Sequence, residues 1–198
     1  MNTTDSPVSG KVILIGSSGV GKTSLITYFL TNTFTQQELS TVAPASCSAT
    51  IQVEDSSVDL QIWDTAGQEK FQSISQMFYR NADIAFVCFT QETFDTIENW
   101  IERIRAESPK CLLFLVVTKA DLLSTDDLSS LQNRCFSVQE QVGASYTFIT
   151  SSSTGLGIRD LFQFAGNEIH SLNKPVETVS QTVLVPSENV EQKQKCKC

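Results

Sequence analysis

The chain has 198 residues, of which 40% are hydrophobic and 18% are charged, and its formal net charge is −8. This length and composition predict one domain with a sizeable apolar core, with room for a tail. The acidic balance argues against broad binding to a nucleic-acid backbone, which requires a basic face, so nucleic acid is not expected as a partner.

Targeting signals and structural metal sites find little support in the sequence. The start, MNTTDSPVSG, has neither a basic segment nor an apolar core, and Asn2 stands where myristoylation needs glycine. The longest apolar run, residues 111–117, is far too short to span a bilayer. The scattered cysteines form no CxxC pair, so thiols in a reducing cytosol are expected rather than a zinc site. They are Cys47, Cys88, Cys111 and Cys135.

Apolar runs typical of strands alternate with helical patterns along the chain. The strands are expected at Lys11–Ile15, Thr50–Val53, Val58–Trp63, Ile84–Phe89, Cys111–Val117 and Tyr146–Thr150. Apolar residues spaced by three and four predict helices between them, one carrying Phe94, Ile97, Ile101 and Ile104 and another carrying Leu161, Phe162, Ala165 and Ile169. The order predicts an α/β domain with a six-stranded, mostly parallel sheet and helices on both faces.

The helical periodicity stops near Leu172. The remaining residues are polar, include Pro175 and Pro186, and are too poor in apolar side chains to form a core. We therefore expect a domain over residues 1–172 and a flexible tail over 173–198. A coil of this length has a typical span of roughly 25–30 Å.

The stretch GSSGVGKT fits the phosphate-loop pattern G-x-x-x-x-G-K-[ST] between a strand-like run and a helical one. Its backbone N–H groups and the start of the helix favour a phosphate, Lys22 adds a full charge, and the Thr23 hydroxyl is a ligand for Mg²⁺. The residues expected to hold phosphate are Ser17, Ser18, Gly19, Val20, Gly21, Lys22, Thr23 and Ser24. The probability that a chain of this length matches the phosphate-loop pattern by chance is below about one in a hundred. Adenylate-type kinases and ATPases share this loop, so it fixes neither the base nor the reaction.

Two later stretches narrow the chemistry. DTAGQEKF follows a strand, which places Asp64 in a Mg²⁺ shell, the Gly67 N–H near a terminal phosphate, and Gln68 where it orients a water. Alone, this stretch would be interpreted as a tight Asp–Gly turn. In VVTKAD, Asp121 accepts two hydrogen bonds from guanine, a donor pair that adenine lacks, and the stem of Lys119 lies over the base.

These segments together resemble the Ras superfamily of small GTPases, and most closely the Rab family. The resemblance covers roughly residues 10–170. It is carried by the segments GSSGVGKTSL, LQIWDTAGQEKF, MFYRNADIAFV and NWIERI, together with SPK and VVTKAD. It implies the G-domain fold of phosphate-loop NTPases and a switch that binds GTP or GDP with Mg²⁺, hydrolyses GTP and regulates vesicle traffic. Carried over by position, it implies Mg²⁺ contacts at Thr23, Thr41 and Asp64, a catalytic Gln68, and nucleotide contacts at Phe34, Thr41, Gly67, Thr118, Lys119, Asp121, Ser151, Ser152 and Ser153.

The sequence departs from that family at several positions. Thr118 stands where most members have Asn, although relatives of the Rho type tolerate Thr, so GTP binding is expected to survive. TSSSTG replaces the usual Ser-Ala-Lys, so Ser153 supplies no Lys side chain. The loop FTQETF is short and lacks the customary acidic residue. The segment STVAPASCSATI, which corresponds to the first switch of the family, keeps Thr41 but diverges strongly after it. Rabs commonly present a surface cluster of three aromatic residues. Here Trp63 is kept and Phe78 takes the Tyr position, but Ser46 stands where the Phe is usual.

The chain ends in KQKCKC, which resembles the Rab signal for double geranylgeranylation at Cys196 and Cys198. Two lipids give stable anchoring where one is marginal. The alternative is an inert tail with reactive thiols. The resemblance implies a monomer at the cytoplasmic face of intracellular membranes, with a cytosolic pool. Its expected partners are an exchange factor, a GTPase-activating protein, effectors, a prenylation escort and a GDP-dissociation inhibitor.

Two rival functions remain open at this point. One is a guanine-nucleotide-dependent binding module with negligible turnover, against which Ser18 and Gln68 argue because both are usual in hydrolysing Rabs. The other is a nucleotide kinase, which needs an arginine-rich lid. The helical region after Asp121 carries only Arg134, so the kinase is disfavoured.

Overall fold

A single six-stranded sheet organises the computed structural model, which describes residues 8–35, 45–65 and 77–173. The strand order is β2-β3-β1-β4-β5-β6. Only β2 runs antiparallel to its neighbour, and every other adjacent pair is parallel. The strands are β1 (Val8–Ile15), β2 (Ala45–Val53), β3 (Ser56–Asp64), β4 (Ile84–Phe89), β5 (Leu112–Val117) and β6 (Tyr146–Ile149). The predicted mostly parallel sheet is therefore confirmed.

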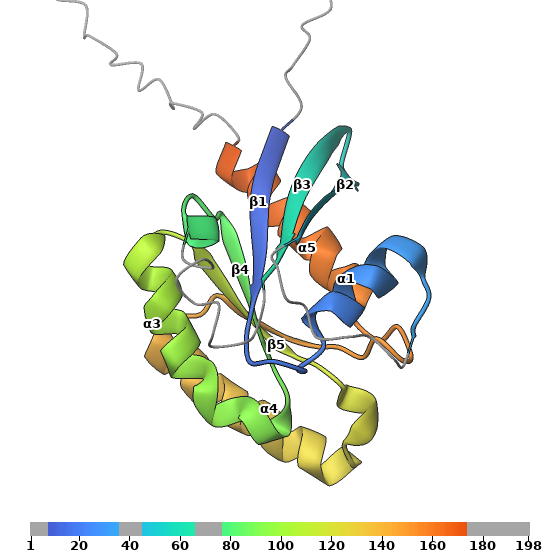
Figure 1. Cartoon of the computed structure of the whole chain (residues 1–198), viewed down its shortest axis with the longest axis vertical. Coiled ribbons are helices and arrows are strands. Elements are labelled where there is room, and N and C mark those ends of the chain that lie inside the picture. Colours follow the sequence, from blue (N-terminus) through green and yellow to red (C-terminus); the bar gives the residue numbers. More distant parts are fainter. Residues whose placement is uncertain (1–7, 36–44, 66–76, 174–198) are drawn as a thin grey trace, which may run out of the picture.

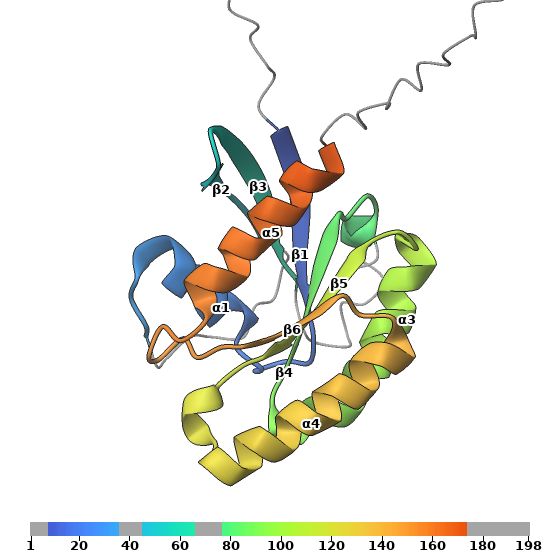
Figure 2. The same cartoon turned by 180° about the vertical axis from the view of Figure 1, so that it is seen from behind.

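Helices cover both faces of this sheet (Figures 1 and 2). Helices α1 (Lys22–Thr31) and α5 (Ile158–Asn173) pack on one face, and α3 (Ile97–Glu107) and α4 (Thr125–Val142) on the other. Short 3₁₀ turns, η2 (Gln91–Thr96) and η3 (Ala120–Leu122), lead into α3 and precede α4. No helix within the described residues is long and apolar enough to cross a membrane.

The apolar patterns explain which strands lie inside. β4 and β5 read IAFVCF and LLFLVV, and nearly all of their residues are buried because helices lie on both faces. In β3 the alternating Val58, Leu60 and Ile62 are fully buried, while the residues between them are less so. This is the half-exposed strand that the alternation predicts.

The structure corrects the predicted elements most clearly in two places, and the other strand ends differ from the predicted ones by at most three residues. β2 begins at Ala45, five residues before the predicted Thr50, because antiparallel pairing with β3 extends through the weakly apolar stretch ASCSA. Phe94, assigned from its spacing to the following helix, lies in η2 instead. There Thr90 and Thr93 form a reciprocal capping box, which starts a separate short turn before α3.

The fold gathers the chemically notable segments at one edge of the sheet. The phosphate loop follows β1, Asp64 ends β3, Thr118 follows β5 and Ser151 follows β6. Because β1, β3, β5 and β6 run in the same direction, these residues all lie at the carboxyl ends of their strands. Ligands of open α/β sheets bind at that edge.

Candidate functional site

The phosphate loop joins β1 to α1 through backbone conformations that favour glycine. Gly21 is the N-cap of α1 with φ 103°, and it has no side chain with which to cap the helix. A Cβ on Gly16 would collide with the carbonyl oxygen of Cys88 in β4. The loop therefore sits tightly against the sheet and directs the positive end of α1 toward a ligand, which suits an anion.

Lys22 lies inside this loop rather than in solvent. It is buried, and its Nζ donates to the carbonyl oxygens of Gly16 at 2.8 Å and Ser17 at 3.0 Å. Burial lowers the pKa of Lys22, while nearby Cys88 and Asp64 oppose that shift. The ammonium group is thus held by carbonyl oxygens at the loop, where it can face a phosphate.

Thr23 and Asp64 meet across the site although they are 41 positions apart in the sequence. The Thr23 hydroxyl donates to Asp64 Oδ2 at 2.6 Å, and Asp64 is buried. Within the described residues no group of three or more His, Cys, Asp or Glu side chains could hold a metal. A hydroxyl and one carboxylate still fit Mg²⁺, which is typically bound by one or two carboxylates together with substrate phosphates and water.

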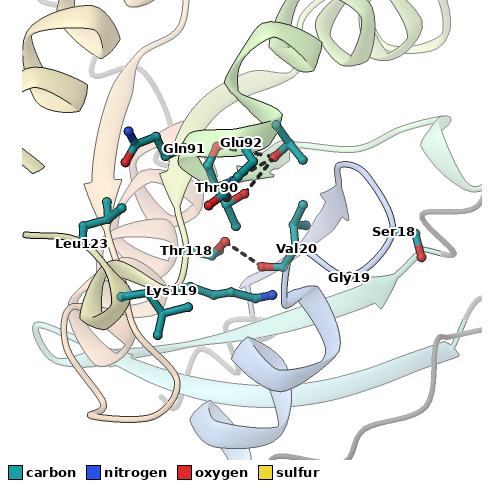
Figure 3. Close-up of a pocket in the computed structure, with 11 residues that line it drawn as sticks. Ser18, Gly19, Val20, Thr90, Gln91, Glu92, Thr118, Lys119 and Leu123 are labelled. Carbon is teal, nitrogen blue, oxygen red and sulfur yellow. Dashed lines mark hydrogen bonds between the residues drawn. The ribbon is translucent and has the colours of Figure 1, made fainter. Parts of the chain in front are cut away.

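Thr118 connects the phosphate loop to the turn after β5. Its buried hydroxyl lies 2.6 Å from the carbonyl oxygen of Val20 and 3.0 Å from that of Phe89, as Figure 3 shows for the bond to Val20. Lys119 follows with φ 55°, and its side chain extends toward the phosphate loop (Figure 3). The hydroxyl at position 118 thus fixes the loop to the end of β5.

Asp121 lies on the neighbouring turn and is held by serine residues that follow β6. The Ser151 hydroxyl donates to Asp121 Oδ1, and Ser153 Oγ lies 3.0 Å from Ser151 Oγ. Partial burial raises the pKa of Asp121. Three kinds of interaction lower it: hydrogen bonds from Ser151 and Ser153, a hydrogen bond from its own backbone, and the charge of Lys119. Together they outweigh burial, so the pKa of Asp121 lies below its usual range. The carboxylate is therefore ionised at neutral pH and oriented as an acceptor.

A pocket of about 140 Å³ opens beside these residues (Figure 3). Three segments line it: the phosphate loop, the turn after β4 and the turn after β5. The lining residues are Ser18, Gly19, Val20, Thr90, Gln91, Glu92, Thr93, Thr118, Lys119, Leu122 and Leu123. This hollow thus brings together Ser18, Gly19 and Val20 of the phosphate loop with Thr118 and Lys119 of the predicted base segment, whereas Lys22, Thr23, Asp64 and Asp121 are not among its lining residues.

Other residues predicted for the site fall elsewhere. Phe34 follows α1 and is 44% exposed. Ser24 lies in the first turn of α1, and Ser152 is half-buried beside Ser151. Five predicted residues lie outside the described ranges: Thr41, Gly67, Gln68, Cys196 and Cys198.

Two supporting residues were not predicted from the sequence. Thr65 is buried, and its hydroxyl donates to the carbonyl oxygen of Leu14 at 2.6 Å, which anchors the segment that follows Asp64. Tyr28 of α1 sits so close to Gly155 that a Cβ there would overlap its hydroxyl. The place of Thr65 directly after Asp64 was an available signal, whereas no local pattern pointed to Tyr28.

Trp63 and Phe78 form an aromatic pair at the surface next to the site. Their ring centroids are 5.2 Å apart, and Lys11 Nζ lies 5.1 Å from the Trp63 ring centroid. Ser46, opposite Trp63 in the β2–β3 register, is exposed. Two of the three positions of the expected cluster are thus aromatic and in contact, and the third carries a hydroxyl.

Comparison with known proteins gives consistent matches. Residues 11–171 match the model of the Ras family. Among curated proteins, Ras-related protein RABF2a of Arabidopsis thaliana is 32% identical over 159 residues, which cover 78% of each chain. Ras-related protein RABA1c of the same plant is 31% identical, over 89% of this chain and 83% of the relative. Ras-related protein Rab-11A of Dictyostelium discoideum is 30% identical, over 89% of this chain and 88% of the relative.

Proposed function

The chain belongs to the Ras family as a divergent Rab-type small GTPase, and from that premise we propose that the cleft around Lys22, Asp64 and Asp121 binds GTP and GDP together with Mg²⁺. As a family member it is a GTP hydrolase and a guanine-nucleotide switch in membrane traffic, with regulators and effectors as its partners. The proposal also assigns individual residues to binding of the phosphates, Mg²⁺ and the base, and to hydrolysis.

One observation supports this proposal most strongly. The Thr118 hydroxyl bonds to Val20 of the phosphate loop, so the base-reading turn and the phosphate loop are fixed to each other. A ligand that fills both halves must carry phosphate at one end and a base at the other. Asp121, ionised and oriented by Ser151, accepts the paired N1–H and amino donors of guanine.

On the phosphate side, each residue has a separate role. Lys22 would contact the β- and γ-phosphates as a positive charge, and Thr23, Asp64 and Thr41 would hold Mg²⁺. The ion, when bound, neutralises charge on the phosphate oxygens. Gly67 would donate its N–H to the terminal phosphate, and Phe34 would pack across the edge of the base.

Gln68 is proposed to orient the water that attacks GTP, since a glutamine amide is too weak a base to deprotonate it. Turnover by the isolated protein is expected to be slow, and an arginine from an activating protein adds about 10³–10⁵ in rate. Gln68→Leu should retain nucleotide binding and slow single-turnover hydrolysis. Equal rates for wild type and variant, with and without cell extract, would refute this role.

Membrane attachment is proposed to occur through geranylgeranyl groups on Cys196 and Cys198. One lipid chain gives marginal binding and two give stable anchoring, and Lys193, Lys195 and Lys197 add attraction to anionic lipid. A prenylation escort and a GDP-dissociation inhibitor would handle the lipidated form. Intact-mass measurement of protein from its native cells tests this, and an unmodified C-terminus would count against it.

Effector choice is proposed to depend on Ser46. Aromatic anchors often contribute most of the energy of an interface, and here a hydroxyl borders the Trp63–Phe78 pair. Ser46→Phe should therefore gain affinity for effectors of other Rabs or lose it for the native effector. Calorimetry that finds equal binding of both proteins to all effectors would refute the proposal.

The binding proposal is tested by the nucleotide that the protein retains. Full-length protein purified in Mg²⁺ and then heat-denatured should release about one guanine nucleotide per chain, because a tightly bound ligand stays with the native state and is released when the chain unfolds. Release of adenine nucleotide instead would contradict it. Lys22→Ala, prepared in the same way, should release none.

A further inference from the structure

The terminal strand β6 is as apolar as its neighbours but is not covered like them. Its sequence is YTFI, and all four residues are half-buried, whereas β4 is buried throughout. β6 pairs with β5 on one side, and no described strand pairs with its other edge. The strand therefore presents unpaired backbone groups between apolar side chains.

Apolar side chains flank this open edge on both faces of the sheet. On the α5 face, the ring centroid of Phe164 lies 4.5 Å from that of Tyr146 and 5.6 Å from that of Phe148. On the α4 face, Phe136 is 68% exposed. One turn further along α4, Gln139 accepts a hydrogen bond from Thr147 of β6, which places this part of the helix beside the strand. Helices α5 and α4, which carry these two phenylalanines, lie on opposite sides of β6 (Figure 2).

The strand itself and the segments beside it in the sequence also lack the charges that usually protect an edge strand. Between Glu140 and Arg159 the sequence contains no Asp, Glu, Lys or Arg. Natural edge strands are commonly blunted by lysine, proline or a bulge, because an open edge templates pairing with another strand. An uncharged apolar edge therefore fits a strand that has apolar residues on both of its faces.

The chain carries such a segment in its own tail. Residues Thr182–Val185 read TVLV, β-branched except for one Leu, and Pro186 follows, which suits the end of a strand. α5 passes the start of β6, where Tyr146 Oη lies 3.3 Å from Glu168 Oε1, and Asn173 is the last residue of α5. The nine residues from Asn173 to Thr182 reach at most about 30 Å when extended, enough to cross the few strand widths to the edge.

We propose that Thr182–Val185 docks on the open edge of β6 as a seventh strand. Ile169, near the end of α5, packs against Gly10 of β1, so the tail starts at the amino ends of the parallel strands. A segment that crosses from there to the edge at β6 runs parallel to β6, in keeping with the neighbouring pairs. The other edge of the sheet, at β2, fits this segment poorly. One face of β2 there carries the exposed polar residues Ser46, Ser48, Thr50 and Gln52, whereas TVLV is apolar on both faces.

Docking would shorten the free spacer between the domain and the proposed lipid sites. About 12 residues would then separate Pro186 from Cys198 instead of about 25, so the typical coil span falls from roughly 27 Å to roughly 19 Å. This consequence rests on the proposed lipidation, whereas the docking itself does not. The experiment that tests docking therefore uses neither lipid nor membrane.

Hydrogen exchange in the full-length, GDP-loaded protein tests the inference directly. Amides in residues 145–150 should exchange about tenfold more slowly in wild type than in Leu184→Asp, because a docked strand bonds the outward-facing groups of β6 and a charge at this apolar edge prevents docking. Asn189→Asp adds the same charge beyond Pro186 and should behave like wild type. Phe136→Ser, at an exposed position on α4, should lose part of the protection without touching the tail.

Equal exchange in wild type and Leu184→Asp would overturn the proposal. Protection that disappears on dilution of the wild type, with a dimer seen by sedimentation, would also overturn it and assign the edge to a second copy. Protection that is lost in Leu184→Asp and independent of protein concentration would establish docking within one chain. Retained guanine nucleotide in each variant shows that the result is separate from nucleotide binding.

Discussion

The two halves of the proposed nucleotide site, the phosphate loop with Asp64 and the turns after β5 and β6, are built in different ways. On the phosphate side the residues match the family pattern, and Lys22, Thr23 and Asp64 are held by short hydrogen bonds to the loop or to one another. On the base side, two positions depart from the pattern. Thr118 stands for the usual Asn and Ser153 for the usual Lys.

The difference separates the contacts that need a particular side chain from those that need only a hydrogen bond. The hydroxyl of Thr118 lies within hydrogen-bonding distance of both Val20 and Phe89, so a shorter side chain can hold the phosphate loop. Ser153 joins the hydrogen-bonded group around Asp121 but offers no alkyl stem to cover a base. We therefore expect the phosphate side to tolerate substitution least and position 153 most.

The largest effect is expected at Lys22. Lys22→Ala should weaken GDP and GTP affinity by about 1,000-fold, because charge-assisted hydrogen bonds to phosphate contribute about 1.5–3 kcal/mol each. Stopped-flow or equilibrium titration with a fluorescent GDP analogue measures this loss. Lys110→Ala removes an exposed lysine outside the cleft and is the matched control. A loss below tenfold would mean that the buried ammonium does not face the phosphates.

Asp121 should show the next largest effect. Asp121→Asn should lower guanine-nucleotide affinity by about 100-fold, since a carboxylate that accepts two donors is replaced by an amide that accepts one. Affinity for xanthine nucleotides, which present an acceptor where guanine has a donor, should rise in the same variant. Asp126→Asn in the exposed first turn of α4 is the control. Unchanged base preference would show that another group reads the base.

Thr118 tests whether the two halves are coupled. Thr118→Val keeps the shape of the side chain but removes the donor to Val20, so nucleotide affinity should fall about tenfold with a loss of about 1–2 kcal/mol in unfolding free energy. Thr118→Ser and Thr118→Asn both keep a donor and should lie within a few-fold of wild type. Denaturant titration and nucleotide titration on the same samples separate stability from binding. If the Val and Ser variants bind alike, the hydroxyl does not position the loop.

Ser153 should show the smallest effect. Ser153→Lys restores the residue usual in the family, and its flexible stem should tighten GDP binding by no more than about threefold. Thr154→Lys adds the same charge at the next exposed position and corrects for general attraction to the phosphates. A gain above tenfold at position 153 alone would mean that the base side is weakened in the natural protein.

Much of the fold follows from local sequence patterns. Continuous apolar runs identified β4 and β5, and alternation identified β3. The start of β2 at Ala45 was not predictable in this way because pairing with β3, and not local hydrophobicity, sets it. Phe94 was assigned to a helix because spacing alone does not distinguish a 3₁₀ turn capped by Thr90 and Thr93 from the first turn of α3.

The residues of the candidate site likewise fall into two groups, those that sequence motifs predicted and those whose contacts only the structure reveals. The two motifs predicted that Lys22, Thr23 and Asp64 belong to one site, and the structure joins Thr23 to Asp64 by a hydrogen bond across 41 positions. The bond from Thr118 to Val20 spans 98 positions and involves a backbone oxygen, so no spacing rule indicates it. The same holds for Tyr28 beneath Gly155, which only the packing of α1 against the turn after β6 reveals. The roles assigned to these residues remain predictions.

The most direct test of the central claim is competition for the cleft between purine nucleotides. Full-length protein loaded with fluorescent GDP in Mg²⁺ is titrated with unlabelled GTP and, separately, with ATP. We expect displacement by GTP near stoichiometric concentration and by ATP only at concentrations higher by about 1,000-fold or more, because the Asp121 carboxylate is left unpaired against adenine. Displacement by both nucleotides at equal concentrations would contradict it.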